Sequence, residues 1–331
     1  MLPEAAIDQP GQAELGQWKS ACLRLAVAWA LLFAVTFAEW AEMAHQWWNI
    51  DTYSHILLIP PIIAWLTWLR RAELARVSPQ GWWPGALWLV SGLGLWTVGR
   101  GLDINLIAQT GTVTAFQGAV IAILGLRASL LLAFPLFYSF FLVPFGDEII
   151  PQLQAITAHI TTWLTIASGI DTVSDGIYID TPAGLFIVAE ACSGVKFLIA
   201  MVALGVLVAH TCFMSWRSRA LLMLACIVVP IIANGIRAWA TIFIAQYIGA
   251  EAAGSFDHVV YGWFFFGIVI AMVLGVAWRW FERDPEDAGF SAAQVAGLEL
   301  VQRQRAAPAT QLVFAAVLLI TSAFAVLARL V

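Results

Sequence analysis

Long apolar runs separated by short polar segments make up almost the whole chain. A helix needs about 20 apolar residues to cross a bilayer, and we find about nine runs of that kind. They lie at roughly 22–39, 54–69, 84–100, 104–124, 128–145, 191–213, 219–248, 258–280 and 311–329. No internal repeat is evident. The pattern predicts an all-α polytopic membrane protein with about nine transmembrane helices.

The composition excludes the soluble classes. Of the 331 residues, 61% are hydrophobic and only 11% are charged, whereas soluble domains carry about 25% charged residues. There is no basic patch of the kind that binds nucleic acid, so we expect no nucleic-acid partner. The first 20 residues are polar and acidic, so we expect no cleavable signal peptide.

The basic residues predict the orientation, because cytoplasmic flanks of transmembrane helices are enriched in Lys and Arg. If the N-terminus is cytoplasmic and the spans alternate, 12 of the 16 basic residues share the cytoplasmic side. These are Lys19, Arg24, Arg70, Arg71, Arg76, Arg127, Arg217, Arg219, Arg279, Arg283, Arg303 and Arg305. We therefore expect a cytoplasmic tail (1–21), a core of eight spans (22–280), a cytoplasmic linker (281–310) and an additional C-terminal span (311–331).

The longest outer segment, 146–190, contains no Lys or Arg. Its first part places apolar residues on one helical stripe and polar residues elsewhere, a pattern typical of a helix that lies in the membrane interface. The stripe is Ile149, Leu153, Ile156, Ile160, Trp163 and Ala167; the polar positions are Gln152, Gln154, Thr157, Thr161 and Thr165. The alternative is a helix that crosses the membrane, which would reverse the orientation of every later loop.

The second part of this segment predicts a short β-hairpin. β-branched residues in 176–180 and 185–188 flank a Pro/Gly turn at 181–184. The second strand would lead directly into Glu190 and Cys192. The alternative is an extended loop packed on the helices.

Three reactive side chains fall at the same depth of separate spans. At about 1.5 Å per helical residue, Arg237 lies ~27 Å from the inner Arg219, and His258 lies ~31 Å from Arg279. Both values match a hydrocarbon core of ~30 Å. Cys192 begins the sixth span at the same outer boundary. We therefore expect Cys192, Arg237 and His258 at one membrane face.

Cys192 is the candidate nucleophile. A thiol attacks as its thiolate, a form that helix N-termini and nearby cations favour, and Cys192 opens its predicted helix. The alternative is a small packing residue, the role we expect of Cys22, Cys212 and Cys226. Those three lie toward the inner side, so Cys192 has no expected disulfide partner, and no CxxC pair suggests a metal or redox motif.

Arg237 and His258 are the candidate charged and proton-transferring groups. An Arg inside an apolar span is a functional-site hypothesis by default; the alternative is a structural ion pair with Glu190 or another acid. Asn234 lies one helical turn before Arg237, and His258 follows Asp257 at a helix start. A zinc site is not expected, because the remaining histidines lack ligand spacing; these are His45, His55, His159 and His210.

Taken together, these motifs resemble the exosortase family, the membrane enzymes that process proteins bearing a C-terminal PEP-CTERM sorting signal. The likeness runs through roughly 45–280 and is greatest to the proteobacterial exosortase A type. It is carried by Glu190-Ala191-Cys192-Ser193-Gly194, by Asn234-Gly235-Ile236-Arg237, by His258 with Tyr261-Gly262-Trp263 and Phe266, and by Tyr53-Ser54-His55 with Leu58-Ile59-Pro60.

The resemblance implies a role for each site residue. Cys192 is expected to be the nucleophile, Arg237 to stabilise the oxyanion, and His258 to act as general acid and base. Lys196 stands where many relatives carry Arg, which keeps the charge but loses a bidentate fork. The supporting residues are expected to be Glu190, Ser193, Gly194, Lys196, Asn234, Asp257 and Trp263.

The resemblance also implies the function and the partners. We expect a cysteine protease or transpeptidase in the bacterial inner membrane that cleaves its clients through a thioester, with its site facing the periplasm and no metal or organic cofactor. Clients would be exported proteins with a C-terminal Pro-Glu-Pro motif, a transmembrane helix and a basic tail. Membrane lipid would surround the enzyme, and the acceptor is water or an amine. The alternative is a transporter or lipid-linked saccharide-handling protein in which Arg237 and His258 bind an anionic headgroup.

Overall fold

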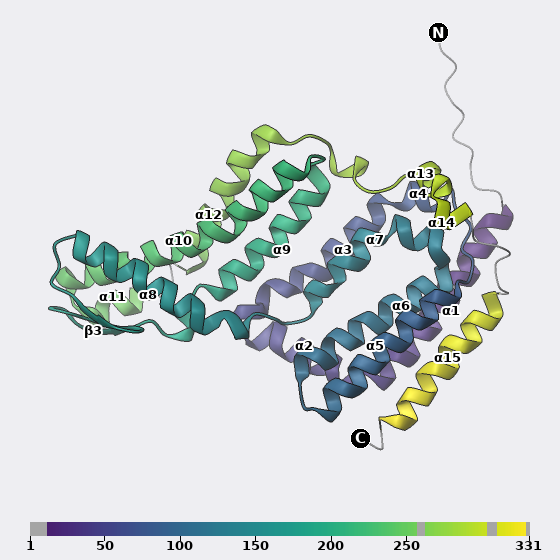
Figure 1. Ribbon diagram of the computed structural model, residues 1–331, viewed down its shortest axis with the longest axis horizontal. Coiled ribbons are helices and arrows are strands. Elements are labelled where there is room, and N and C mark those ends of the chain that lie inside the picture. The colour runs from purple at the N-terminus through teal and green to yellow at the C-terminus, as the bar shows by residue number, and fades with distance from the viewer. Residues whose placement is uncertain (1–11, 257–261, 303–309, 329–331) are drawn as a thin grey trace, which may run out of the picture. The chain divides into compact units, whose positions relative to one another are not determined.

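The computed structural model describes residues 12–256, 262–302 and 310–328 of a mainly helical protein (Figure 1). Among these residues, six helices are long and apolar enough to cross a membrane. Two pairs of shorter helices, Ala133–Leu142 with Asp147–Ala167 and Phe264–Trp280 with Pro285–Gly297, raise this number to eight if each pair is one span. The predicted class, an all-α polytopic membrane protein, is confirmed, although the described residues contain six to eight candidate spans where about nine were predicted.

The chain folds into two compact units. The first, which we call the scaffold unit, comprises residues 1–49, 56–144 and 289–331. The second, the site unit, comprises residues 50–55 and 145–288 and contains Cys192 and Arg237. The short segment 50–55 therefore packs with elements that begin about 90 residues later in the chain.

The scaffold unit is built from helices, and two of its predicted spans are interrupted. The first predicted span is divided between α1 and α2, and the expected span 128–145 is not one continuous helix. The elements are α1 (Gln12–Val35), α2 (Phe37–Asn49), α3 (Ile59–Leu69), α4 (Arg71–Leu74), α5 (Trp83–Gly101), α6 (Asn105–Leu131), α7 (Ala133–Tyr138), the 3₁₀ helix η2 (Ser139–Leu142), α13 (Ala292–Gly297), α14 (Glu299–Gln302) and α15 (Thr310–Leu327).

Helices α5 and α6 form an antiparallel pair held by glycines seven residues apart. A Cβ atom added to any of these glycines would overlap the backbone of the opposite helix; they are Gly85, Gly92 and Gly99 on α5, and Gly111 and Gly118 on α6. Small residues allow this close approach, which supplies van der Waals contact where lipid offers no hydrophobic drive between helices. The hydropathy pattern did not reveal this seven-residue spacing of glycines.

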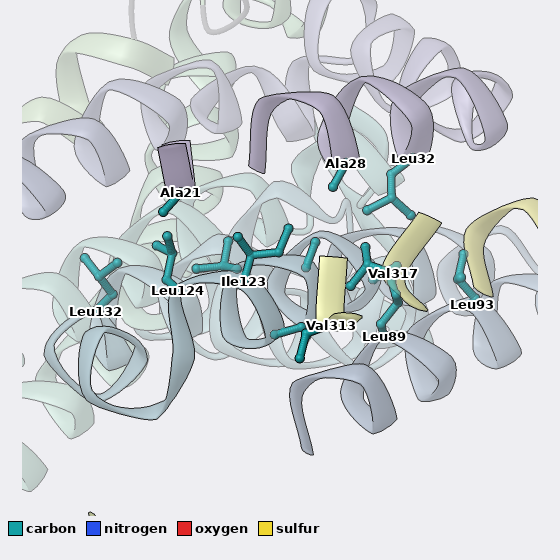
Figure 2. Close-up of a cluster of buried hydrophobic side chains, with 14 of the residues drawn as sticks. Ala21, Ala28, Leu32, Leu89, Leu93, Ile123, Leu124, Leu132, Val313 and Val317 are labelled. Atoms are coloured by element: carbon teal, nitrogen blue, oxygen red, sulfur yellow. The ribbon is translucent and has the colours of Figure 1, made fainter. Parts of the chain in front are cut away.

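The close pair carries the core of the scaffold unit. Helices α1 and α15, from opposite ends of the chain, pack on it (Figure 2). Leu89 and Leu93 of α5 and Val313 and Val317 of α15 are buried in this core, together with Leu32 of α1. The last helix is therefore part of the scaffold unit.

The site unit combines helices with one small sheet. Its elements are η3 (Asp147–Ile149), α8 (Ile150–Ala167), β1 (Val173–Asp175), β2 (Tyr178–Thr181), β3 (Gly184–Ile187), η4 (Glu190–Cys192), α9 (Val195–Cys212), α10 (Trp216–Ile248), α11 (Ala250–Phe256), α12 (Gly262–Ala277), η6 (Trp278–Trp280) and η7 (Pro285–Asp287). The 3₁₀ helix η1 (Asp51–Leu58) begins in the site unit and continues into the scaffold unit.

Helix α10 is the longest element of the site unit. Its 33 residues correspond to about 50 Å, more than the ~30 Å of a hydrocarbon core. If Arg219 lies at the inner boundary, the part of α10 beyond Arg237 extends out of the core. Helix α8 packs against the middle of α10, on both sides of Arg237 (Figure 1): the Thr161 hydroxyl donates to the Gly235 carbonyl, and the Trp239 indole N–H donates to the Ser168 hydroxyl.

Helix α8 turns its polar face toward the protein. Thr157, Thr161 and Thr165 are almost completely buried, whereas Ile156 and Trp163 of the predicted apolar stripe are exposed. In lipid this arrangement is favourable, because hydroxyl groups find partners inside the protein and apolar side chains face the membrane. The predicted helix is confirmed; its interfacial placement stays a prediction.

The predicted hairpin is present and is extended by a third strand. Strands β2 and β3 pair antiparallel, with Thr181 opposite Gly184 across a two-residue turn. Strand β1 pairs with the other edge of β2, so the order is β1-β2-β3. One face of the sheet packs on the helices, because Ile179 and Val188 share a buried cluster with Ala158 of α8.

The start of α10 is held by the carboxylate of Glu282, which lies near the end of the site unit in sequence. The Glu282 carboxylate accepts hydrogen bonds from the Ser218 hydroxyl and from the amides of Ser215 and Met214, each at 2.6 Å. The bond from Ser218 and then that from Ser215 lower the pKa of Glu282. The carboxylate therefore satisfies helix-terminal N–H groups that would otherwise lack partners.

The glycine contact predicts a position-specific effect on stability. Gly92→Ala should destabilise the protein by about 1–3 kcal/mol, the usual cost of overpacking, because its new Cβ would overlap Ala115. Gly94 on the same helix has nothing within 4 Å of an added Cβ, so Gly94→Ala is the matched control and should not destabilise. Thermal unfolding in detergent measures both; equal melting temperatures would contradict the close pairing.

Candidate functional site

Cys192 lies between the sheet and the helix α9. Strand β3 ends at Ile187, and the short 3₁₀ helix η4 carries Glu190 and Cys192 before α9 begins. The Cys192 amide donates to the Ala189 carbonyl at 2.9 Å, which closes this turn. Cys192 is half-buried and packs against the cluster that contains Ile179 and Val188. Its side chain is therefore supported from the inner face of the sheet.

The turn after Cys192 depends on Gly194. Its φ of +82° is the left-handed conformation that glycine adopts without steric cost. A Cβ atom at this position would lie 2.7 Å from the Asn234 side chain. The neighbouring Ser193 is 2% exposed, and Glu190 on the other side of Cys192 is exposed. Gly194 thus allows α10 to approach the Cys192 turn closely.

Asn234 connects Cys192 to two helices. Its Nδ2 donates to the Cys192 carbonyl at 2.8 Å and to the Thr157 hydroxyl at 3.1 Å. Its Oδ1 accepts a hydrogen bond from Nη2 of Arg237 at 3.3 Å. Asn234 itself is 2% exposed. One buried amide therefore joins the predicted nucleophile, α8 and the predicted stabilising Arg.

Arg237 is held in a mostly apolar environment. It is 9% exposed and lines a cavity of about 10 Å³, near the volume that one water molecule needs. Besides Asn234 and Arg237, the lining is apolar and includes Phe197 and Phe266, whose rings stack with centroids 4.6 Å apart. A guanidinium in such surroundings interacts more strongly with a developing negative charge than one in water.

Thr157 is a site residue that the sequence reasoning did not identify. Its hydroxyl accepts from Asn234 and donates to the Ser193 carbonyl at 3.4 Å. One turn later, the Thr161 hydroxyl donates to the Gly235 carbonyl at 3.3 Å. The sequence did carry a signal for this role: threonines recur every four residues, so their hydroxyl groups share one face of the helix. Lipid offers those hydroxyl groups no hydrogen-bond partner, so that face is expected to turn toward the protein.

The early segment of the site unit, residues 50–55, contacts the later part of the same unit. Lys196, one turn after Cys192, lies 3.9 Å from the Asp51 carboxylate. The Tyr53 hydroxyl donates to Asp147 at 2.6 Å. This segment includes the Tyr53-Ser54-His55 motif. The hydropathy pattern did not indicate that this segment contacts the start of α9.

His258 and Asp257 lie outside the described residues, as does the side chain of Trp263. Their placement at the site stays a prediction. Among the residues that the structure describes, no group of three or more His, Cys, Asp or Glu side chains is arranged to hold a metal ion. The described side chains that meet at the site are a thiol, a guanidinium, an amide and a hydroxyl.

A family model described as transmembrane exosortase matches residues 47–275. The matched range begins just before the Tyr53 segment and includes Cys192, Asn234 and Arg237. No curated protein and no solved structure matched the chain.

The hydroxyl of Thr157 should be needed to hold the Cys192 turn. Thr157→Val keeps the shape but leaves buried groups of Asn234 and Ser193 without this partner, which costs about 1–3 kcal/mol. We expect a lower melting temperature and an altered rate of Cys192 alkylation by maleimide, whereas Thr157→Ser should resemble the wild type.

The matched control is Thr162→Val on the same helix. The Thr162 hydroxyl is buried and has no hydrogen-bond partner among the described groups, so its removal should not lower stability. Equal effects of Thr157→Val and Thr162→Val on stability and alkylation would show that the hydroxyl of Thr157 does not position Cys192.

Proposed function

This chain belongs to the transmembrane exosortase family, and from that premise we propose that it is a membrane-embedded cysteine peptidase or transpeptidase. The family places it in the sorting of proteins with PEP-CTERM signals. The proposed reaction cleaves the client near its Pro-Glu-Pro motif and holds it as a thioester. The exosortase A subtype stays a prediction.

The proposed chemistry uses three side chains. The Cys192 thiolate attacks the carbonyl carbon of the client, and Arg237 stabilises the negative charge that develops on the carbonyl oxygen. As the C–N bond breaks, the leaving amine takes a proton from His258. Water or an amine then gives its proton to His258, attacks the thioester carbon and releases the Cys192 sulfur.

The observation that supports this proposal most directly is the position of Asn234. Its amide spans from the Cys192 carbonyl to the Arg237 guanidinium, so both reactive residues are held by one buried side chain. The same amide thus fixes the backbone of the turn that carries the Cys192 thiol and orients the guanidinium that the proposal assigns to the oxyanion. The burial of Arg237 adds support, because a charge enclosed near a bilayer is costly and such residues are found mainly where they serve a function.

The proposed location follows from the basic residues and the family. We place the enzyme in the bacterial inner membrane with Cys192 at the periplasmic face. Its clients are exported proteins whose C-terminus carries the Pro-Glu-Pro motif, an apolar helix and a basic tail. Lipid surrounds the spans, and the client helix approaches them from the side.

Replacing the thiol should abolish processing. Cys192→Ala and Cys192→Ser should both fold yet leave a client with a PEP-CTERM signal uncleaved, because an alanine has no nucleophile and a serine hydroxyl is far less acidic than a thiol. The exposed Cys22 offers the control: Cys22→Ala should process normally. The measurement is the change in client mass on coexpression.

The same experiment separates the proposal from its alternative. A transporter or lipid-linked saccharide-handling protein that binds an anionic headgroup through Arg237 and His258 would tolerate Cys192→Ala. Retained cleavage in that variant would reject covalent catalysis by Cys192 and leave the headgroup-binding function as the better account.

A positive charge at position 237 should not be sufficient for processing if the planar guanidinium is lost. Arg237→Lys should lower the rate about 10²–10³-fold, the typical cost of losing one oxyanion donor, because lysine cannot reproduce the guanidinium geometry. Arg219, near the start of the same helix, donates to the Phe213 carbonyl, and Arg219→Lys is the control with near-normal rate expected. Near-normal turnover of Arg237→Lys would reduce its role to a diffuse positive charge.

A further inference from the structure

Strand β3 has an open edge that leads to Cys192. The sheet order is β1-β2-β3, so β3 pairs with β2 on one side, and no other described strand pairs with its second side. Strand β3, labelled in Figure 1, ends at Ile187, five positions before Cys192. An open edge with free N–H and C=O groups is a template for pairing with another extended chain.

The register identifies which amides face this edge. The Val188 amide donates to the Ile177 carbonyl at 3.0 Å, so residues in phase with Val188, such as Phe186, direct their backbone toward β2. Leu185 and Ile187 are out of phase. Their amide N–H groups and the Leu185 carbonyl therefore point to the open edge, while the Ile187 carbonyl accepts a hydrogen bond from the Ala189 amide at 3.0 Å.

The side chains of β3 leave the edge unprotected. Natural edge strands are commonly blocked by charged residues or proline, but β3 reads Gly-Leu-Phe-Ile. The side chains of Leu185 and Ile187 are 60% and 53% exposed. The opposite edge strand β1 reads Val-Ser-Asp and carries an acidic residue. The apolar open edge is thus the one adjoining the site.

The sheet and Cys192 also share packing. Ile179, Phe186 and Cys192 belong to one buried cluster on the inner face of the sheet. A chain paired along β3 would therefore run beside elements that already support the thiol. This continuity favours a substrate over an unrelated occupant.

We propose that the open edge of β3 binds an extended segment of the client next to the bond to be cut, as a fourth strand of the sheet. The inference rests on the proposed function. Strand addition supplies main-chain hydrogen bonds that do not depend on sequence, whereas alternate side chains supply specificity. Leu185 and Ile187 select apolar side chains at alternate client positions. The client must be unwound there, because helical amides are already paired.

Cross-linking tests the position of the client. In a Cys192→Ala background, Leu185→Cys and Ile187→Cys should form disulfides with single cysteines placed at alternate positions of a reporter that the wild-type chain processes. Val173→Cys is the matched control on the opposite edge, where Val173 is 71% exposed. Equal cross-linking at both edges, or cross-links only between two copies of this chain, would overturn the proposal.

Proline scanning tests the backbone bonds. Leu185→Pro removes an amide that points to the open edge and is outside the β2–β3 ladder, so processing should fall at least about tenfold; Leu185→Ala should retain most of it. Ser174→Pro is the control on the opposite edge. Ser174 lies opposite Ile179, whose backbone groups bond to β3, so the Ser174 amide points away from β2 and its loss leaves the ladder intact. Normal processing by a folded Leu185→Pro variant would overturn the proposal.

The two proposals fail in different ways. If Cys192→Ala still processes the reporter, the proposed function is wrong whatever the edge variants do. If Cys192→Ala is inactive while Leu185→Pro processes normally and the 185 and 187 cross-links are absent, the catalytic proposal stands and the strand-addition proposal is wrong. Melting temperatures of the proline variants show whether each is folded.

Discussion

The buried amide of Asn234 is the constraint on which the rest of the site unit depends. Its nitrogen donates to the Cys192 carbonyl and to Thr157, and its oxygen accepts from Arg237. Because leaving a buried polar group unsatisfied costs about 1–3 kcal/mol, roughly twice what a made hydrogen bond contributes, these partners must stay in place together. The requirement extends to Gly194, where a side chain would collide with Asn234, and to α8, which must present Thr157 inward.

The two units associate their helices by different means. In the scaffold unit, glycines at intervals of seven bring the α5 and α6 backbones into contact. In the site unit, hydroxyls of α8 reach carbonyls near Cys192 and on α10. Both solutions suit a solvent in which apolar side chains gain little by facing each other. The glycine contact provides rigidity without polar groups, while the hydroxyl contacts place polar groups where the proposed chemistry needs them.

The site is assembled from segments that are far apart in the chain. The turn carrying Cys192, the middle of α10 and the inward face of α8 meet at Asn234, and the segment near Tyr53 reaches the same unit through Asp147 and Lys196. The family match over residues 47–275 covers all of these segments. The sheet adds an open edge beside the thiol, a feature suited to an extended peptide rather than to a small headgroup.

Much of this protein could be predicted from its sequence, because the physics concerned is local. Apolar runs identify helices that cross a membrane wherever they lie, since each helix satisfies its own backbone bonds. The turn at Thr181–Gly184 indicated the hairpin, and an Arg inside an apolar run marked Arg237. Tertiary structure alone decided the rest. The inward face of α8, the bridge made by Asn234 and the partners of the α5 glycines depend on what a neighbouring helix presents, and hydropathy along one chain carries no information about the neighbour.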